Sequence, residues 1–130
     1  RIAIWQLTAL EGVSDGKSQA VTETLRASLM KSDWFKIIAR DQMKEVLKAQ
    51  EISLTESCES TECAVEYGRM LSVKKIVVGS ISKVGNINSV VIKLVNVENA
   101  EVEKIGQARA SKDKKGLFDV VELAAYNMFE

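Results

Sequence analysis

The chain has 130 residues, 46% of them hydrophobic and 28% charged, and its 18 basic and 18 acidic side chains give a net charge of zero. This balance argues against a protein that binds nucleic acid or an anionic membrane through a strongly basic surface. The chain has no histidine, which excludes a histidine general base, a histidine-based triad and a histidine metal ligand.

The first 31 residues predict a strand and a helix. Residues 2–7 form a short apolar run, in which Ile2, Ile4 and Trp5 are expected to be buried. A glycine-containing loop over 11–16 follows. Val21, Leu25 and Leu29 then recur every four residues and predict a helix over 17–31.

Residues 34–71 predict a second strand and two more helices. The run 34–39 is apolar and rich in β-formers, and Asp41 is the expected N-cap of a helix that ends near Glu51. A polar loop over 53–61 precedes a third helix over 62–71.

Residues 74–97 predict a hairpin, because two β-rich runs flank the two-residue connection Gly85-Asn86. Both runs hold apolar residues back to back, so we expect central strands covered on both faces. A tight turn over 98–100 leads to a more polar strand over 101–111, which is expected near an edge of the sheet. Apolar residues at 117, 121, 124 and 128 predict a closing helix.

These elements predict one α/β domain over 1–130, in the order β-α-β-α-α-β-β-β-α. The sheet is expected to be mixed, with about five strands and a C-terminal antiparallel meander, and the helices are expected to pack on its faces. The chain opens at Arg1 inside a β-like run, so we expect a domain excised from a longer lipoprotein or envelope precursor.

Cys58 and Cys63 are the two cysteines of the chain. One interpretation is a disulfide that joins the polar loop to the third helix and indicates an oxidising compartment such as a periplasm. The other is two unpaired thiols, one buried and one exposed. Two thiolates without histidine are too few ligands for a tetrahedral metal site, so we predict no metal and no cofactor.

No pattern in the chain predicts catalysis. Gly79-Ser80 lacks the flanking residues of a nucleophile elbow or a phosphate loop, and mid-strand Gly79 instead predicts a bulge or close packing by a helix. Trp5 and Trp34 both lie on predicted strands. Either would be the best candidate for a partner contact if it were exposed.

Three runs of the sequence together resemble a known family. They are WFKIIARDQM from Trp34, continuing to Leu47; CAVEYGRMLSVKKIVVGSISKVG over 63–85; and LVNVENAEV over 94–102. The family is the envelope domain shared by curli-secretion (CsgG-like) proteins, the amino-terminal domain of TolB and lipoprotein activators of penicillin-binding proteins.

The resemblance implies a fold and a location more than an activity. Its motif residues Gly68, Gly79 and Gly85 are structural, and it implies a periplasmic domain held at the outer membrane by a lipid anchor outside this chain. That location supports the disulfide. Asn99-Ala100 replaces the Thr-Gly usual in the family, and the turn is expected to survive because asparagine tolerates positive φ.

The resulting hypothesis is a non-catalytic module that binds envelope proteins, with a regulatory or scaffolding role. The first alternative is the periplasmic ring domain of a curli-type secretion channel, which would be a homo-oligomer. A further alternative is a nucleic-acid-binding module resembling tRNA anticodon-binding domains, which the zero net charge opposes.

Overall fold

The computed structural model describes residues 1–31, 35–54 and 56–129. In these ranges the chain forms a five-stranded mixed sheet and four helices, which confirms the predicted α/β class and the predicted mixed sheet with a C-terminal antiparallel meander. The elements are β1 (Ile2–Ile4), β2 (Thr8–Ala9), α1 (Asp15–Met30), α2 (Arg40–Lys48), α3 (Thr61–Met70), β3 (Lys75–Val84), β4 (Ile87–Asn96), β5 (Val102–Ser111) and α4 (Leu117–Phe129).

The sheet is built around β3. On one side β3 pairs in parallel with β1 and, further along, with β2; on the other it pairs antiparallel with β4, which pairs antiparallel with the edge strand β5. The predicted hairpin is therefore present, with its turn at Gly85-Asn86. Gly85 has a φ of 58° and Asn86 is not among the residues with positive φ, which is the pattern of a type II′ turn.

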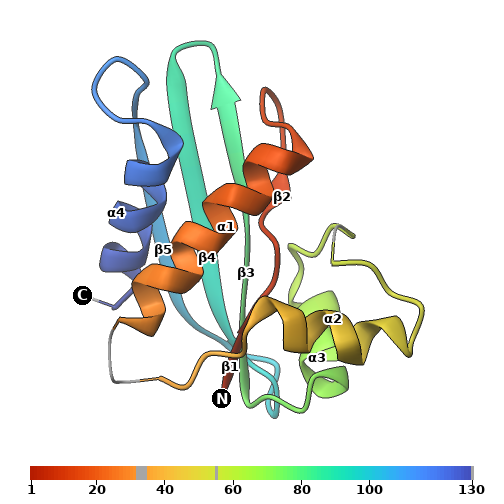
Figure 1. Ribbon diagram of the computed structural model, residues 1–130. Coiled ribbons are helices and arrows are strands. Elements are labelled where there is room, and N and C mark those ends of the chain that lie inside the picture. The colour runs from red at the N-terminus through yellow and green to blue at the C-terminus, as the bar shows by residue number, and fades with distance from the viewer. Residues whose placement is uncertain (32–34, 55, 130) are drawn as a thin grey trace.

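Each face of the sheet contributes to its own hydrophobic core. One core joins α1 and α4 to side chains such as Val77, Ile81 and Val90, and Figure 1 shows these two helices lying side by side across the sheet. The other core joins α2, α3 and the loop between them to Ile76, Val78 and other side chains of the opposite face.

The second strand differs from the prediction in its position. Within 34–39, Ile37 forms an isolated parallel bridge with Ile2, and the fifth strand of the sheet is Thr8–Ala9. Asp41 is not the N-cap of α2: the helix begins at Arg40, its N-cap is Ala39, and Asp41 lies in the first turn.

The turn between β4 and β5 uses positive φ at a different residue from the one predicted. Ala100, rather than Asn99, has a φ of 61°. Asn96 stabilises this turn, because its Oδ1 accepts hydrogen bonds from the backbone N–H groups of Glu98 and Asn99. The expectation that Asn99 carries the positive φ is therefore wrong.

Candidate interaction surface

Cys58 and Cys63 form a disulfide, with their Cα atoms 5.7 Å apart. The bond joins the loop before α3 to the first turn of that helix, whose N-cap Ser60 accepts a hydrogen bond from the N–H of Cys63. Cys58 is buried and its N–H donates to Oγ1 of Thr8 in β2. The loop is thus tied both to α3 and to the sheet.

Trp5 holds the same loop through contacts in the protein interior and is not available as a partner contact. Its side chain is 0% exposed, stacks on Tyr67 of α3 with ring centroids 4.2 Å apart, and donates from Nε1 to the carbonyl of Glu56. Trp34 lies outside the described residues.

Tyr67 completes this connection. Its hydroxyl donates a hydrogen bond of 2.8 Å to Oε2 of Glu56. That bond, together with partial burial and the negative charges of Glu56 and Glu66, raises the pKa of Tyr67 to about 12. The loop is consequently held by a disulfide, an indole hydrogen bond and a phenol–carboxylate pair.

The three glycines implied by the resemblance have different surroundings. A Cβ on Gly68 would collide with the side chain of Val97, and one on Gly79 would collide with the carbonyl of Val91, whereas Gly85 faces open space but has positive φ. The sequence predicts a bulge or a helix packed on Gly79; the structure instead places the backbone of β4 against it.

The distal part of one sheet face is uncovered, on the side away from α1 and α4 and beyond the part that α3 covers. We call it the open sheet face. Side chains of β3, β4 and β5 that share this face lie in register, with Ser80 beside Val91 and Gln107, and Ser82 beside Ser89 and Arg109. Its members, all half-buried or exposed, are Ser80, Ser82, Val84, Ile87, Ser89, Val91, Lys93, Ile105, Gln107, Arg109 and Ser111.

The open sheet face combines apolar side chains with positive charge. Val84 is 54% exposed and Ile105 58% exposed, while Lys93 and Arg109 are its ionisable members. Four members of this face, together with the adjacent Ala108, line a hollow of about 370 Å³: Ser89, Val91, Gln107 and Arg109. Lys93 donates to the carbonyl of Glu59, so the disulfide-bonded loop borders this surface.

The outer edge of β5 adjoins the open sheet face. Lys112 donates its N–H to the carbonyl of Asn86, so the alternating pattern of an antiparallel pair turns the backbone groups of Ile105, Gln107 and Arg109 away from β4. Asn127 of α4 donates to the outward carbonyl of Gln107 at 2.9 Å. An amide side chain therefore occupies one backbone acceptor of the edge.

The residues that the structure describes do not bring together a catalytic set. Ser80 lies mid-strand in β3, opposite Val91, and Glu103 forms an ion pair with Lys75 at 2.7 Å on the sheet surface. This pairing, with a further hydrogen bond from Asn96, lowers the pKa of Glu103. No group of three or more Cys, Asp and Glu residues with metal-binding geometry occurs in the described part of the chain.

Sequence reasoning missed the open sheet face, although a signal for it is present. Ser80 and Ser82 alternate with buried residues along β3, as do Ser89, Val91 and Lys93 along β4. Such alternation is typical of a strand with one solvated face. The prediction of strands covered on both faces followed the apolar run Ile76–Val78 and is wrong for the distal half of the hairpin.

Comparison with known proteins identifies the family. The model of the family described as "Curli production assembly/transport component CsgG" matches residues 2–89, which is more than half of the chain. The chain belongs to the CsgG family. No curated protein matches it in sequence.

Solved structures of bacterial proteins share the fold of this CsgG-family domain. The LpoB C-terminal domain from Escherichia coli superimposes with a TM-score of 0.67 at 18% identity, covering 85% of this chain and 81% of that one. Lipoprotein GNA1162 from Neisseria meningitidis gives 0.66 at 11% identity, covering 85% and 78%. A PelC dodecamer from Paraburkholderia phytofirmans gives 0.58 at 16% identity, covering 97% and 83%.

The described residues contain no helix that is both long and apolar enough to cross a membrane.

Proposed function

We propose that this CsgG-family domain is a non-catalytic protein-interaction module of the bacterial cell envelope, and that the open sheet face binds its partner. The observation that carries this proposal is a rigid antiparallel sheet whose exposed face joins Val84, Ile87 and Ile105 to the cations Lys93 and Arg109. Apolar side chains within a polar rim are typical of a protein-binding surface. The two cations favour a partner with an acidic border.

The location we propose is the periplasm, with the full-length protein held at the outer membrane by a lipid anchor outside this chain. Membership of the CsgG family supports an envelope location. The disulfide between Cys58 and Cys63 also supports it, because disulfides persist in oxidising compartments.

Site-specific photocrosslinking tests this function. A photoreactive amino acid at position 105, on the open sheet face, is expected to yield a discrete adduct with an envelope protein in cells that make the full-length protein. The same probe at Glu122, exposed on the outer side of α4, serves as the matched control. Equal adducts at both positions would show that the open sheet face is not the binding surface.

A single substitution sharpens the test. Ile105→Arg places a third cation on the exposed apolar part of the face, and it is expected to weaken partner binding at least roughly tenfold through lost apolar burial. The melting temperature should remain unchanged, because Ile105 is 58% exposed. Glu122→Arg is the control that should leave binding intact.

The second candidate function is a ring-forming domain of a curli-type secretion assembly. The edge of β5 favours this second function. The backbone groups of Ile105, Gln107 and Arg109 point away from β4, and an edge strand is able to pair with another chain through such groups. Solution mass separates the two functions: a stable assembly of many copies supports the ring, and a monomer supports the interaction module.

A further inference from the structure

A groove lies at the lower end of the sheet in Figure 1, between α3 and the turn that joins β4 to β5. We call it the α3 groove. It has a volume of about 510 Å³ and is separate from the hollow on the open sheet face. Its lining residues are Thr61, Glu62, Val65, Glu66, Arg69 and Ala100.

Both walls of the α3 groove are fixed by contacts within the protein. Gly68 allows α3 to lie directly against the side chain of Val97 at the start of the turn. The turn itself is held by Asn96, whose Oδ1 accepts hydrogen bonds from the backbone N–H groups of Glu98 and Asn99. The groove is therefore already formed in the free protein, and an occupant does not have to order its walls.

Two apolar residues line the groove and continue the exposed apolar surface of β5. Val65 lines it from α3 and Ala100 from the turn. Val102 follows two residues later, is 39% exposed, and pairs with Val95 of the core that includes α3, so it lies on the same side of the sheet. Ile105 of the open sheet face comes next on that side of β5. The α3 groove and the open sheet face therefore belong to one side of the molecule.

The rim of the α3 groove is charged. Glu62 and Glu66 lie one turn apart on α3, and Arg69 lies about a turn further along. Among the residues that the structure describes, none of these three side chains forms an ion pair with a neighbour. Glu98 and Glu101, both exposed, lie in or beside the turn. The groove and its border therefore carry a net negative charge.

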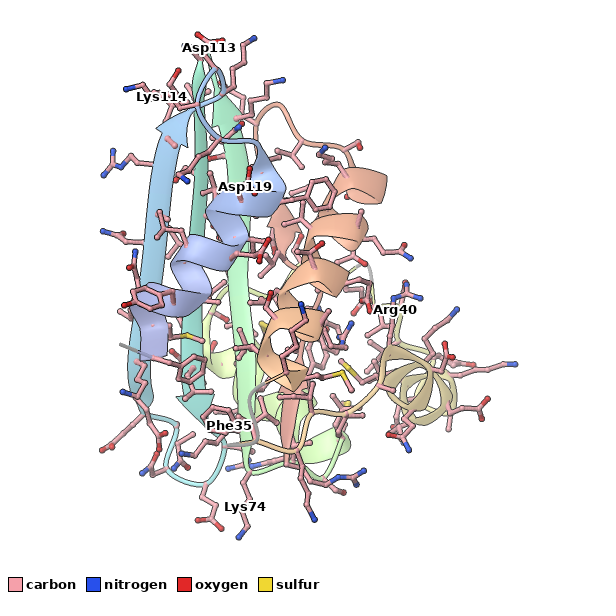
Figure 2. All side chains as sticks on the ribbon, turned by 60° about the vertical axis from the view of Figure 1, so that its left-hand side comes forward. Phe35, Arg40, Lys74, Asp113, Lys114 and Asp119 are labelled. Carbon is pink, nitrogen blue, oxygen red and sulfur yellow. A yellow bond between two sulfur atoms is a disulfide. The ribbon has the colours of Figure 1, made fainter. Side chains whose placement is uncertain are left out.

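The lysines at this end of the sheet are directed elsewhere. Lys75 forms an ion pair with Glu103, and Lys93 donates to the carbonyl of Glu59. Lys74 points into solvent at the end of the molecule, as Figure 2 shows. A cation supplied by a partner would complement the charge of the groove.

We propose that the α3 groove binds a basic, apolar segment of a protein partner. One apolar side chain of the segment lies in the groove against Val65 and Ala100, and a lysine or arginine next to it pairs with Glu62 and Glu66. The proposal rests on the proposed function for the nature of the partner and adds the direction in which that partner lies. Its basic part is at α3, and its acidic part is over the cations of the open sheet face.

Nuclear magnetic resonance titration of the labelled protein tests the proposal with three acetylated and amidated peptides: Lys-Leu-Leu-Lys, Glu-Leu-Leu-Glu and Lys-Ser-Ser-Lys. Shifts are expected at the backbone amides of 61–69 and 99–101. Lys-Leu-Leu-Lys should bind at least roughly fivefold more tightly than either of the others, because it alone supplies both the apolar side chain and the cations.

Charge reversal provides the decisive comparison. Glu62→Lys/Glu66→Lys should invert the preference, so that Glu-Leu-Leu-Glu binds more tightly than Lys-Leu-Leu-Lys. The matched control Glu45→Lys/Glu122→Lys makes the same change at exposed glutamates of α2 and α4 and should leave the preference unchanged. The neutral pair Glu62→Gln/Glu66→Gln preserves the test if the reversed pair destabilises α3, and it should weaken binding of Lys-Leu-Leu-Lys roughly fivefold.

Equal binding of the three peptides, inversion in the control pair as well, or shifts confined to other surfaces would each overturn the proposal. Shifts of the same amides on raising the protein concentration alone would also overturn it, because a second copy of the chain would then occupy the groove. An adduct from the probe at position 105 without any peptide preference would retain the open sheet face and remove only the groove. A peptide preference without that adduct would retain the groove and remove the open sheet face.

Discussion

Gly79 shows how one missing Cβ sets the spacing of two strands. A side chain at this position meets backbone atoms of β4, which have no flexible end that could move aside. Gly16, by contrast, has open space around it near the start of α1.

Gly79→Ala is therefore expected to lower the free energy of unfolding by about 1–3 kcal/mol through overpacking. Gly16→Ala is the matched control and should raise it by about 0.5–1 kcal/mol, since glycine is costly inside a helix. Urea denaturation measures both changes. An unchanged midpoint for Gly79→Ala would show that β3 and β4 do not approach as described.

Ala100 holds a backbone conformation that suits glycine, with a φ of 61°. We expect Ala100→Gly to raise the free energy of unfolding by about 0.5–1 kcal/mol, because relief of the left-handed strain exceeds the entropy cost of glycine. Ala20→Gly on the exposed side of α1 should instead lower it by about 1 kcal/mol. Thermal or urea unfolding of both variants gives the comparison, and loss of stability in Ala100→Gly would contradict the turn geometry.

Tyr67 links one side chain to the pH dependence of stability. Because the hydrogen bond to Glu56 raises the pKa of Tyr67 to about 12, the folded protein keeps this proton after the unfolded chain has lost it. The stabilisation is fully present below about pH 10 and is lost as the pH rises toward 12.

Ultraviolet titration of tyrosinate measures this pKa in a Tyr126→Phe background, which leaves Tyr67 as the one titrating tyrosine. Adding Glu56→Gln should return the midpoint toward 10, because the negative charge of the acceptor is gone. A midpoint near 10 in the presence of Glu56 would refute the pairing.

At the scale of the elements, the loop before α3 depends on its crosslink. Residues 56–60 have no regular secondary structure, and the disulfide closes them onto the first turn of α3. Reduction is expected to lower the free energy of unfolding by about 2 kcal/mol in the chain-entropy model for so short a loop.

Urea denaturation with and without reductant checks this value, and thiol titration of the unfolded, unreduced protein should find no free thiol. The Trp5 and Tyr67 contacts remain after reduction, so the folded state should persist with its near-ultraviolet signal. Equal midpoints in both conditions would mean that the crosslink adds nothing to the native state.

The elements that could be predicted are those whose signal is local. The hairpin of β3 and β4 follows from its β-formers and its Gly85-Asn86 turn, and α1 follows from its repeating apolar residues. Thr8–Ala9 could not be predicted, because a two-residue strand exists only through its pairing with β3. The same limit applies to the stacking of Trp5 on Tyr67: the burial of Trp5 was expected, but its partner lies far away in the sequence.

At the scale of the whole molecule, one side of the sheet is occupied by helices and much of the other is available. The candidate surface could not be predicted in full, because the gap left by α3 over the distal strands is a matter of helix placement rather than of strand pattern. The edge of β5 belongs to the same exposed region. Whether its outward N–H groups are paired with another chain therefore reports on assembly.

Amide hydrogen exchange measures whether these outward N–H groups are paired. The N–H groups of Ile105, Gln107 and Arg109 point away from β4, and they should exchange faster than those of Gly106, Ala108 and Ala110, which pair with β4. Uniform protection along β5 in solution would show that the edge is covered by a second chain, and would favour the ring over the monomeric module.

The parallel pairing of β1 with β3 has a consequence for how the chain is made. Ile2 lies opposite Lys75, so β1 finds its partner only after the intervening helices α1, α2 and α3 have been synthesised. The meander of β3, β4 and β5 joins neighbours in sequence and forms early once it is available. Until then the apolar strand β1 is unpaired, and anything that shields it before β3 is available would decide the yield of folded protein.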